Sequence, residues 1–123
     1  MRPRILLVDD HEIVRKGIRQ LLDVPFLDVC GEASNGEEAV QKVLSLKPDL
    51  VLLDLSMPLM GGVEAMKQIR EVAPEVKIII LTMDHEMANA DGADAWVSKG
   101  SVVSDLHQTI KRVLLGRTPP ESG

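Results

Sequence analysis

The stretch that decides the fold is Val51-Leu-Leu-Asp54-Leu-Ser-Met-Pro58, where an apolar run ends at a carboxylate and then enters a Met-Pro turn. An apolar run without polar alternation predicts a strand buried on both faces, as in a parallel sheet flanked by helices. Asp54 would then stand at the carboxyl end of that strand, which is the edge where open α/β sheets bind ligands. Asp54 is therefore the candidate reactive group, although a simple turn-capping role before Pro58 stays open on these residues alone.

Apolar runs and amphipathic segments alternate along the rest of the chain. In addition to the strand at 50–53, short apolar runs predict strands at 5–8, 27–33, 77–81 and 95–97. Apolar residues at helical spacing predict helices at 13–22, 39–44, 63–72 and 101–115, the last with Ser101 as its candidate cap and Gly116 as its stop. Five strands separated by helices predict a doubly wound parallel sheet with helices on both faces. The flavodoxin-like order 2-1-3-4-5 is common at this size, but the pattern alone does not choose among strand orders.

Composition limits the class of protein. A chain of 123 residues with 45% hydrophobic residues predicts one domain, placed at 1–116, with a linker or disordered tail at 117–123. A net charge of −5 with scattered basic residues argues against nucleic-acid binding by these residues. The single cysteine, Cys30, excludes an internal disulfide and a cysteine-based zinc site. No apolar run approaches the ~20 residues of a membrane span and no signal peptide is recognised, so we expect a cytoplasmic protein without a membrane partner.

Polar residues follow four of the predicted strands. Asp9 and Asp10 follow the first strand, Thr82 ends the fourth and Lys99 follows the fifth, so in the order 2-1-3-4-5 they would surround Asp54. Crowded carboxylates repel one another, and Mg²⁺ is the usual remedy at a shallow site that keeps several waters. A hydroxyl and an ammonium group suit phosphoryl oxygens. Taken singly, each residue has a structural explanation in helix capping, strand propensity or surface solvation, but together they predict phosphoryl transfer to Asp54.

These motifs, with Gly61-Gly62 and Gly92-Ala-Asp-Ala-Trp96-Val-Ser-Lys99, resemble the receiver domain of bacterial two-component response regulators over residues 4 to about 116. The stretches from His11 to Leu22 and from Gly31 to Ala39 most resemble the NarL/FixJ subfamily, whose members follow the receiver with a LuxR-type helix-turn-helix domain. The 123 residues do not include that domain. DNA would accordingly be reached only through an output domain outside this chain.

The resemblance implies that Asp54 is the phosphoacceptor and takes its phosphoryl group from a sensor histidine kinase. It implies that Asp10 and Asp54 ligate Mg²⁺ directly, with the backbone carbonyl of Ser56 as a third ligand and Asp9 acting mainly through water. The domain would catalyse only its own phosphorylation and dephosphorylation. The identity of the kinase and the choice between monomer and homodimer stay open.

The resemblance also assigns the remaining site residues. Thr82 and Lys99 would bind the phosphoryl oxygens, and Thr82 and Trp96 would form the switch pair, with Trp96 in place of the family's usual Tyr or Phe. The side chains of Ser56 and Asp84, each two residues beyond a site residue, are expected to border the path of the attacking water and to modulate the phosphoryl lifetime.

One segment departs from the family's pattern. Only nine residues separate Thr82 from Gly92, where receivers ordinarily hold a loop and a helix of about three turns. A helix this short is marginal on its own. We therefore predict a fourth helix that is shortened or disordered, with Trp96 partly uncovered and the usual dimer face of that helix absent.

Other protein classes fit less well. A haloacid-dehalogenase-type phosphatase needs a second Asp two residues after its nucleophile, where Ser56 stands. A flavodoxin-like electron carrier needs a Ser/Thr/Gly phosphate cradle in its first loop, which here is acidic. A receiver that only binds proteins would lack part of the Asp, Thr and Lys set. A stand-alone receiver of the chemotaxis type, acting as a protein-interaction switch, remains the alternative.

Overall fold

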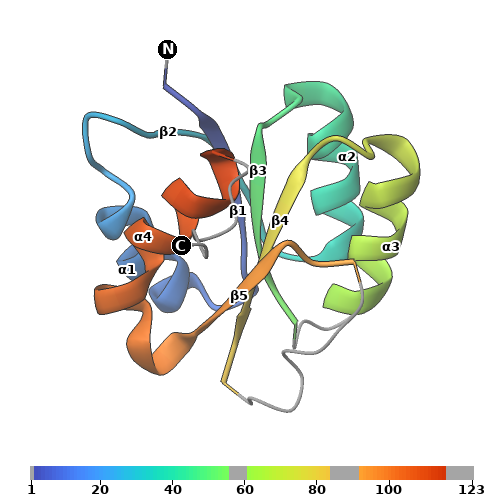
Figure 1. Cartoon of the computed structure of the whole chain (residues 1–123). Coiled ribbons are helices and arrows are strands. Elements are labelled where there is room, and N and C mark those ends of the chain that lie inside the picture. The colour runs from blue at the N-terminus through green and yellow to red at the C-terminus, as the bar shows by residue number, and fades with distance from the viewer. Residues whose placement is uncertain (1, 56–60, 84–91, 116–123) are drawn as a thin grey trace.

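A computed structural model describes residues 2–55, 61–83 and 92–115. The strands and helices predicted from the hydrophobic pattern are confirmed, with boundaries that shift by a few residues. In chain order the elements are β1 (Arg4–Val8), α1 (Glu12–Leu21), β2 (Asp28–Ala33), α2 (Gly36–Leu46), β3 (Leu50–Asp54), α3 (Gly62–Val72), β4 (Lys77–Thr82), β5 (Ala95–Ser98), the 3₁₀ turn η2 (Lys99–Ser101) and α4 (Val102–Leu115) (Figure 1).

The strands form one parallel sheet in the order β2-β1-β3-β4-β5. The predicted flavodoxin-like, doubly wound topology is therefore confirmed. β3 lies at the centre, with Leu53 in register with Val8 of β1 and with Ile80 of β4. All five residues of β3 are buried, which explains why its sequence lacks the polar alternation of a half-exposed strand.

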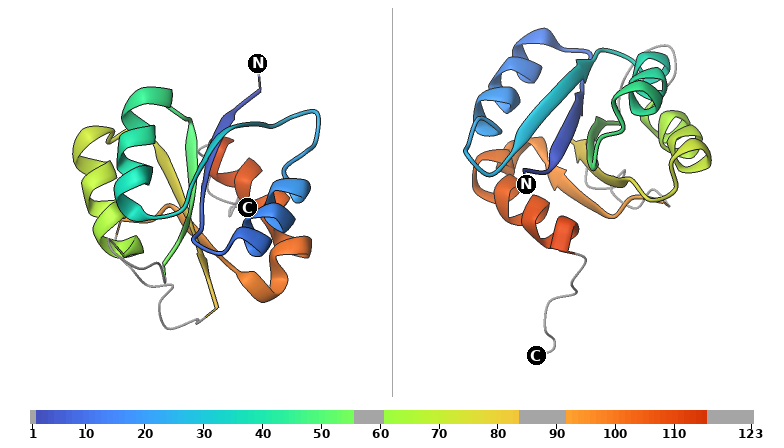
Figure 2. Two further views of the ribbon diagram at one scale, coloured as in Figure 1. Left: turned by 180° about the vertical axis from the view of Figure 1, so that it is seen from behind. Right: turned by 90° about the horizontal axis from the view of Figure 1, so that it is seen from above.

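Helices cover both faces of the sheet, as Figure 2 shows from above. One apolar core joins Val51 and Leu53 of β3 to Val43 of α2 and Ile69 of α3. The other joins Leu50 and Leu52 to Ile18 of α1, to Leu22 directly after α1, and to Leu106 and Ile110 of α4. Successive β3 side chains thus enter opposite cores, because side chains alternate across a strand.

One detail of the predicted helices was wrong, and it concerns the start of α4. In α1, whose existence is confirmed, Ile18 is buried, whereas Ile13 in the first turn is 85% exposed. Ser101 does not act as the predicted side-chain cap, because its hydroxyl donates to the carbonyl of Ser98. Ser98 instead accepts from the Gly100 N–H and caps the 3₁₀ turn that leads into α4. The capping role that the sequence pattern assigned to Ser101 thus belongs to Ser98, at the start of the 3₁₀ turn.

Some expectations concern parts of the chain outside the described ranges. The predicted shortening of the fourth helix falls at residues 84–91 and the predicted tail at 117–123, so both stay predictions. Trp96 is described, and its 40% exposure agrees with the expected partial uncovering. In the ranges that are described, no helix has the length and apolar character needed to cross a membrane.

Candidate functional site

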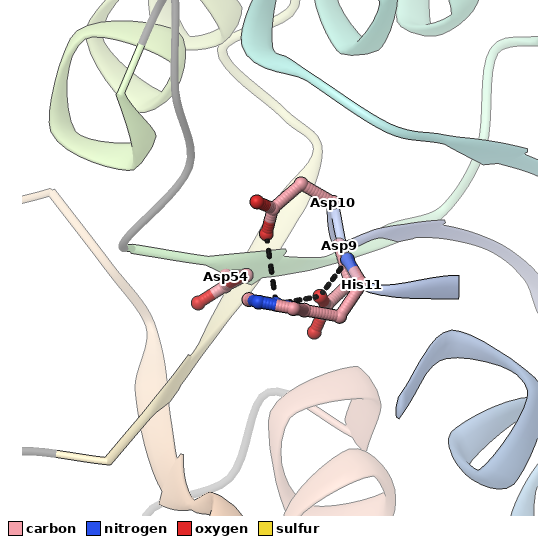
Figure 3. Close-up of side chains that lie close together, drawn as sticks. All are labelled: Asp9, Asp10, His11 and Asp54. Atoms are coloured by element: carbon pink, nitrogen blue, oxygen red, sulfur yellow. Dashed lines mark hydrogen bonds and ion pairs between the residues drawn. The ribbon is translucent and has the colours of Figure 1, made fainter. Parts of the chain in front are cut away.

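The carboxyl edge of the sheet gathers the residues that the sequence singled out. Asp9 and Asp10 lie between β1 and α1, Asp54 is the last residue of β3, Thr82 is the last of β4, and Lys99 follows β5. Because these four strands are neighbours in the sheet, their ends converge. Figure 3 shows Asp9, Asp10 and Asp54 together at this edge, with His11 among them.

Lys99 is the cation of this cluster. Its Nζ lies 3.0 Å from Asp9 Oδ2 and 3.3 Å from Asp54 Oδ1. The Lys99 side chain is only 12% exposed, and those of Asp9 and Asp54 are almost wholly buried. Burial alone would lower the pKa of Lys99, but its hydrogen bond to Asp9 and the charge of Asp54 outweigh burial and raise it. Lys99 therefore stays charged. We call Asp9, Asp10, Asp54 and Lys99 the acidic site.

The acidic site carries more negative than positive charge. Three carboxylates face one ammonium group, and the buried oxygen Asp10 Oδ1 accepts no hydrogen bond from the described residues. The group that faces this oxygen is Nδ1 of His11, 3.1 Å away. A buried carboxylate oxygen without a hydrogen bond is costly unless a cation approaches it. This charge imbalance and the carboxylate oxygens of Asp9, Asp10 and Asp54 fit a hard divalent cation such as Mg²⁺.

Asp9 is already held by its neighbours. Its Oδ1 accepts from the backbone N–H of His11 at 2.9 Å, while its Oδ2 faces Lys99. Asp10 is more open, with a side chain that is 21% exposed. Asp10 is therefore more able than Asp9 to bind a further ligand.

Gly62 brings the start of α3 against the end of β3. A Cβ on Gly62 would lie 2.5 Å from Leu55 Cα and 2.6 Å from the carbonyl oxygen of Asp54. The Gly62 N–H donates to the Leu55 carbonyl at 3.2 Å. Only glycine allows this approach, so Gly62 fixes the backbone that presents Asp54.

The other predicted site residues are placed as follows. Thr82 is buried and pairs in register with Ser98 of β5. Trp96 pairs with Ile80, two residues before Thr82, and is partly exposed. Ser56 and Asp84 lie outside the described residues.

His11 was not among the site residues predicted from the sequence. It entered only as the first residue of the stretch to Leu22 that resembles the NarL/FixJ subfamily, yet its imidazole lies against the carboxylates of Asp9 and Asp10 (Figure 3). The available signal was its position directly after the aspartate pair. Histidine is a common metal ligand, so a histidine directly after two aspartates indicates a candidate site residue.

The fold and the acidic site together define a flavodoxin-like α/β domain with an acidic cluster at the carboxyl edge of its sheet. Comparison with known proteins gives its family. The model of the response regulator receiver domain family matches residues 5–111, so the chain belongs to that family.

Among its relatives, the response regulator GacA of Pseudomonas viridiflava is 39% identical over 121 residues, which cover 93% of this chain and 56% of GacA. A LuxR-family two-component response regulator from Aurantimonas sp. SI85-9A1 superposes with a TM-score of 0.89 at 38% identity, over 95% of this chain and 88% of that one. The response regulator domain of Thermotoga maritima CheB gives a TM-score of 0.84 at 27% identity, over 97% and 100% of the two chains.

These comparisons confirm the predicted family and its NarL/FixJ, LuxR-type subfamily. The chain spans little more than half the length of the GacA proteins that it matches.

Proposed function

We propose that the chain is the phosphorylation-controlled receiver of a two-component response regulator, with Asp54 as the phosphoacceptor. The observation that carries this proposal is the position of Asp54: a carboxylate buried at the end of the central strand, 3.3 Å from the ammonium group of Lys99 and beside Asp9 and Asp10. Such a carboxylate is oriented by rigid backbone and surrounded by the charges that phosphoryl transfer needs.

In the proposed reaction, a carboxylate oxygen of Asp54 attacks the phosphorus of a phosphohistidine on the sensor kinase. The new P–O bond forms as the P–N bond breaks, and the departing imidazole takes up a proton from water. Lys99 neutralises the developing charge on the phosphoryl oxygens, and the hydroxyl of Thr82 donates to one of them. The same site later admits the water that hydrolyses the acyl phosphate. Both steps take place on Asp54, so the domain catalyses only its own phosphorylation and dephosphorylation.

Mg²⁺ is the proposed cofactor. Asp10 and Asp54 would hold it with the backbone carbonyl of Ser56, and Asp9 would act through water. When bound, Mg²⁺ supplies positive charge that offsets the repulsion between the carboxylates and the phosphoryl group. The hydrogen bond from the His11 N–H and the ion pair with Lys99 support the indirect role of Asp9, because both engage its carboxylate.

A protein donor is supported by apolar surface next to the acidic site. An apolar groove between α1 and α4 is lined by Val14, Ile18, Leu21, Val102 and Val103, and it reaches Lys99. Val103 is 77% exposed and Ile13, nearby on α1, is 85% exposed. Exposed apolar surface of this kind is typical of protein-binding sites. We propose that the kinase docks at this end of the molecule, in the cytoplasm.

The proposed output is transcription control through a DNA-binding domain outside this chain. The match to slightly over half of GacA supports this arrangement over a stand-alone receiver. Thr82 and Trp96 would transmit the phosphorylated state, and Ser56 and Asp84 would set its lifetime.

Phosphorylation by acetyl phosphate with Mg²⁺, read by intact mass, tests the proposal. The wild type should gain one phosphoryl group that hydroxylamine removes, and Asp54→Asn should gain none, because an amide cannot form an acyl phosphate. Asp105→Asn, an exposed aspartate of α4, is the matched control and should label normally. Normal labelling of Asp54→Asn would refute the assignment.

A further inference from the structure

The imidazole of His11 lies beside the acidic site, and the proposed reaction does not use it. Its Nδ1 lies 3.1 Å from Asp10 Oδ1 and 3.5 Å from Asp9 Oδ1. Ligand atoms of Asp9, Asp10, His11 and Asp54 all lie within 4.8 Å of one another. The cluster therefore offers a nitrogen donor beside its oxygen donors.

The spacing suits shared coordination. Adjacent ligands of an octahedral cation at metal–ligand distances of about 2.1 Å lie about 3.0 Å apart. The separation of His11 Nδ1 from Asp10 Oδ1 is close to that value. One cation could thus bind both atoms with little movement of either side chain.

The structure gives the His11 side chain no role in helix capping or in the core. It is the N-cap residue of α1, but its side chain makes no capping hydrogen bond. The side chain is 64% exposed, so it contributes little to the core. Its backbone N–H holds Asp9 whatever the side chain is.

We propose that His11 is a metal ligand that raises the affinity of the acidic site for first-row transition-metal cations relative to its affinity for Mg²⁺. Imidazole suits borderline ions such as Co²⁺, Ni²⁺ and Zn²⁺, whereas Mg²⁺ prefers oxygen ligands. The inference rests on the proposed function only because the same carboxylates would hold the cation. It adds a specificity-determining residue and a second class of cation to that site.

First-row transition metals generally bind N/O sites more tightly than Mg²⁺ does. The test is therefore how His11→Gln changes the ratio of Co²⁺ affinity to Mg²⁺ affinity. We would titrate metal-free protein with Co²⁺, following visible absorption, and obtain Mg²⁺ affinity by competition. His11→Gln replaces the nitrogen ligand with an amide whose oxygen still suits Mg²⁺. Loss of an outer partner of a metal ligand already costs about 10–100-fold in affinity. We expect His11→Gln to weaken Co²⁺ binding at least about tenfold and Mg²⁺ binding far less.

A spectroscopic readout separates coordination from electrostatics. Co²⁺ bound to His11 should give a contact-shifted imidazole N–H proton resonance in the wild type, and His11→Gln should lack it. His107→Gln and His85→Gln are the matched controls and should retain it. Persistence of the resonance in His11→Gln, or equal loss of Co²⁺ and Mg²⁺ affinity, would overturn the proposal.

The same samples distinguish this inference from the proposed function. Failure of Asp54 to label with acetyl phosphate and Mg²⁺ would sink the phosphoacceptor role alone. An unchanged ratio of Co²⁺ to Mg²⁺ affinity in His11→Gln would sink the selectivity role alone.

Discussion

Two ion clusters lie close together in this molecule and differ in charge balance and exposure. In the acidic site, Lys99 pairs with the buried carboxylates of Asp9 and Asp54, and the partly exposed carboxylate of Asp10 lies beside them. The second, here called the arginine cluster, sets Arg15 and Arg19 of α1 against Glu32 of β2. There the side chains are 18%, 50% and 29% exposed, and Arg15 Nε donates to Glu32 at 2.7 Å.

Arg15 connects the two clusters. Its second donor, Nη1, hydrogen-bonds the backbone carbonyl of Asp9 at 2.7 Å. The arginine cluster thereby holds the loop that carries the acidic site. The arginine cluster, whose charges are paired near the surface, serves the fold, whereas the excess negative charge of the more deeply buried acidic site indicates a ligand site.

The largest effect on stability is expected where Lys99 is removed. Lys99→Met keeps most of the apolar stem but leaves Asp9 and Asp54 buried without their cation, which should cost about 3–5 kcal/mol in free energy of unfolding. Mg²⁺ should restore part of this loss, because it supplies positive charge at the same oxygens. Urea unfolding with and without Mg²⁺ measures both effects.

Arg19→Met is the matched control for Lys99→Met. Arg19 is half exposed and Glu32 keeps Arg15, so the cost should stay below about 1 kcal/mol and be insensitive to Mg²⁺. Similar losses of unfolding free energy in Lys99→Met and Arg19→Met would mean that charge balance and burial do not make the two clusters differ in their contribution to stability.

The two aspartates of the acidic site should differ in metal binding. Asp10→Ala should weaken Mg²⁺ binding about 10–100-fold or more, and it should slow labelling by acetyl phosphate accordingly. Asp9→Ala should have a much smaller effect, because the Asp9 carboxylate is occupied by the His11 N–H and Lys99. The fluorescence of Trp96, the single tryptophan, offers a readout of binding. Equal effects would show that the direct and indirect roles are assigned wrongly.

The strands and most of the acidic site could be predicted from the sequence. Apolar runs predicted the strands because successive side chains, such as Leu52 and Leu53, point to opposite faces of the sheet and both faces are buried. Once the strand order is known, the ends of β1, β3, β4 and β5 must meet, which is why Asp54 and Lys99 were expected together. The strand order itself was a choice among allowed topologies, and the structure confirms it.

Other features depend on geometry that no local pattern encodes. The direction of the His11 imidazole follows from where α1 begins relative to the end of β1. The pairing of Arg19 with Glu32 joins positions 13 residues apart through tertiary packing of α1 beside β2. Ile13 is exposed because α1 packs on the core through Ile18, near its end, and not through its first turn.

A small effect is also expected for Glu32→Gln, which tests the arginine cluster through pH. Partial burial alone would raise the pKa of Glu32, but hydrogen bonds and charge from Arg19 and Arg15 outweigh burial and lower it. A carboxyl whose pKa is lower in the folded protein stabilises the fold above its unfolded value of about 4.3. That stabilisation is lost as the pH falls through the folded value.

Glu32→Gln should therefore cost up to about 1 kcal/mol in free energy of unfolding at pH 7. The difference from the wild type should shrink as the pH is lowered below about 4. Urea unfolding over this range measures it, and Glu75→Gln, at an exposed position between α3 and β4, is the control. A difference that stays constant with pH would show that Glu32 contributes through packing of its side chain and not through its charge. The arginine cluster would then stabilise the loop of the acidic site only through the bond from Arg15 to Asp9.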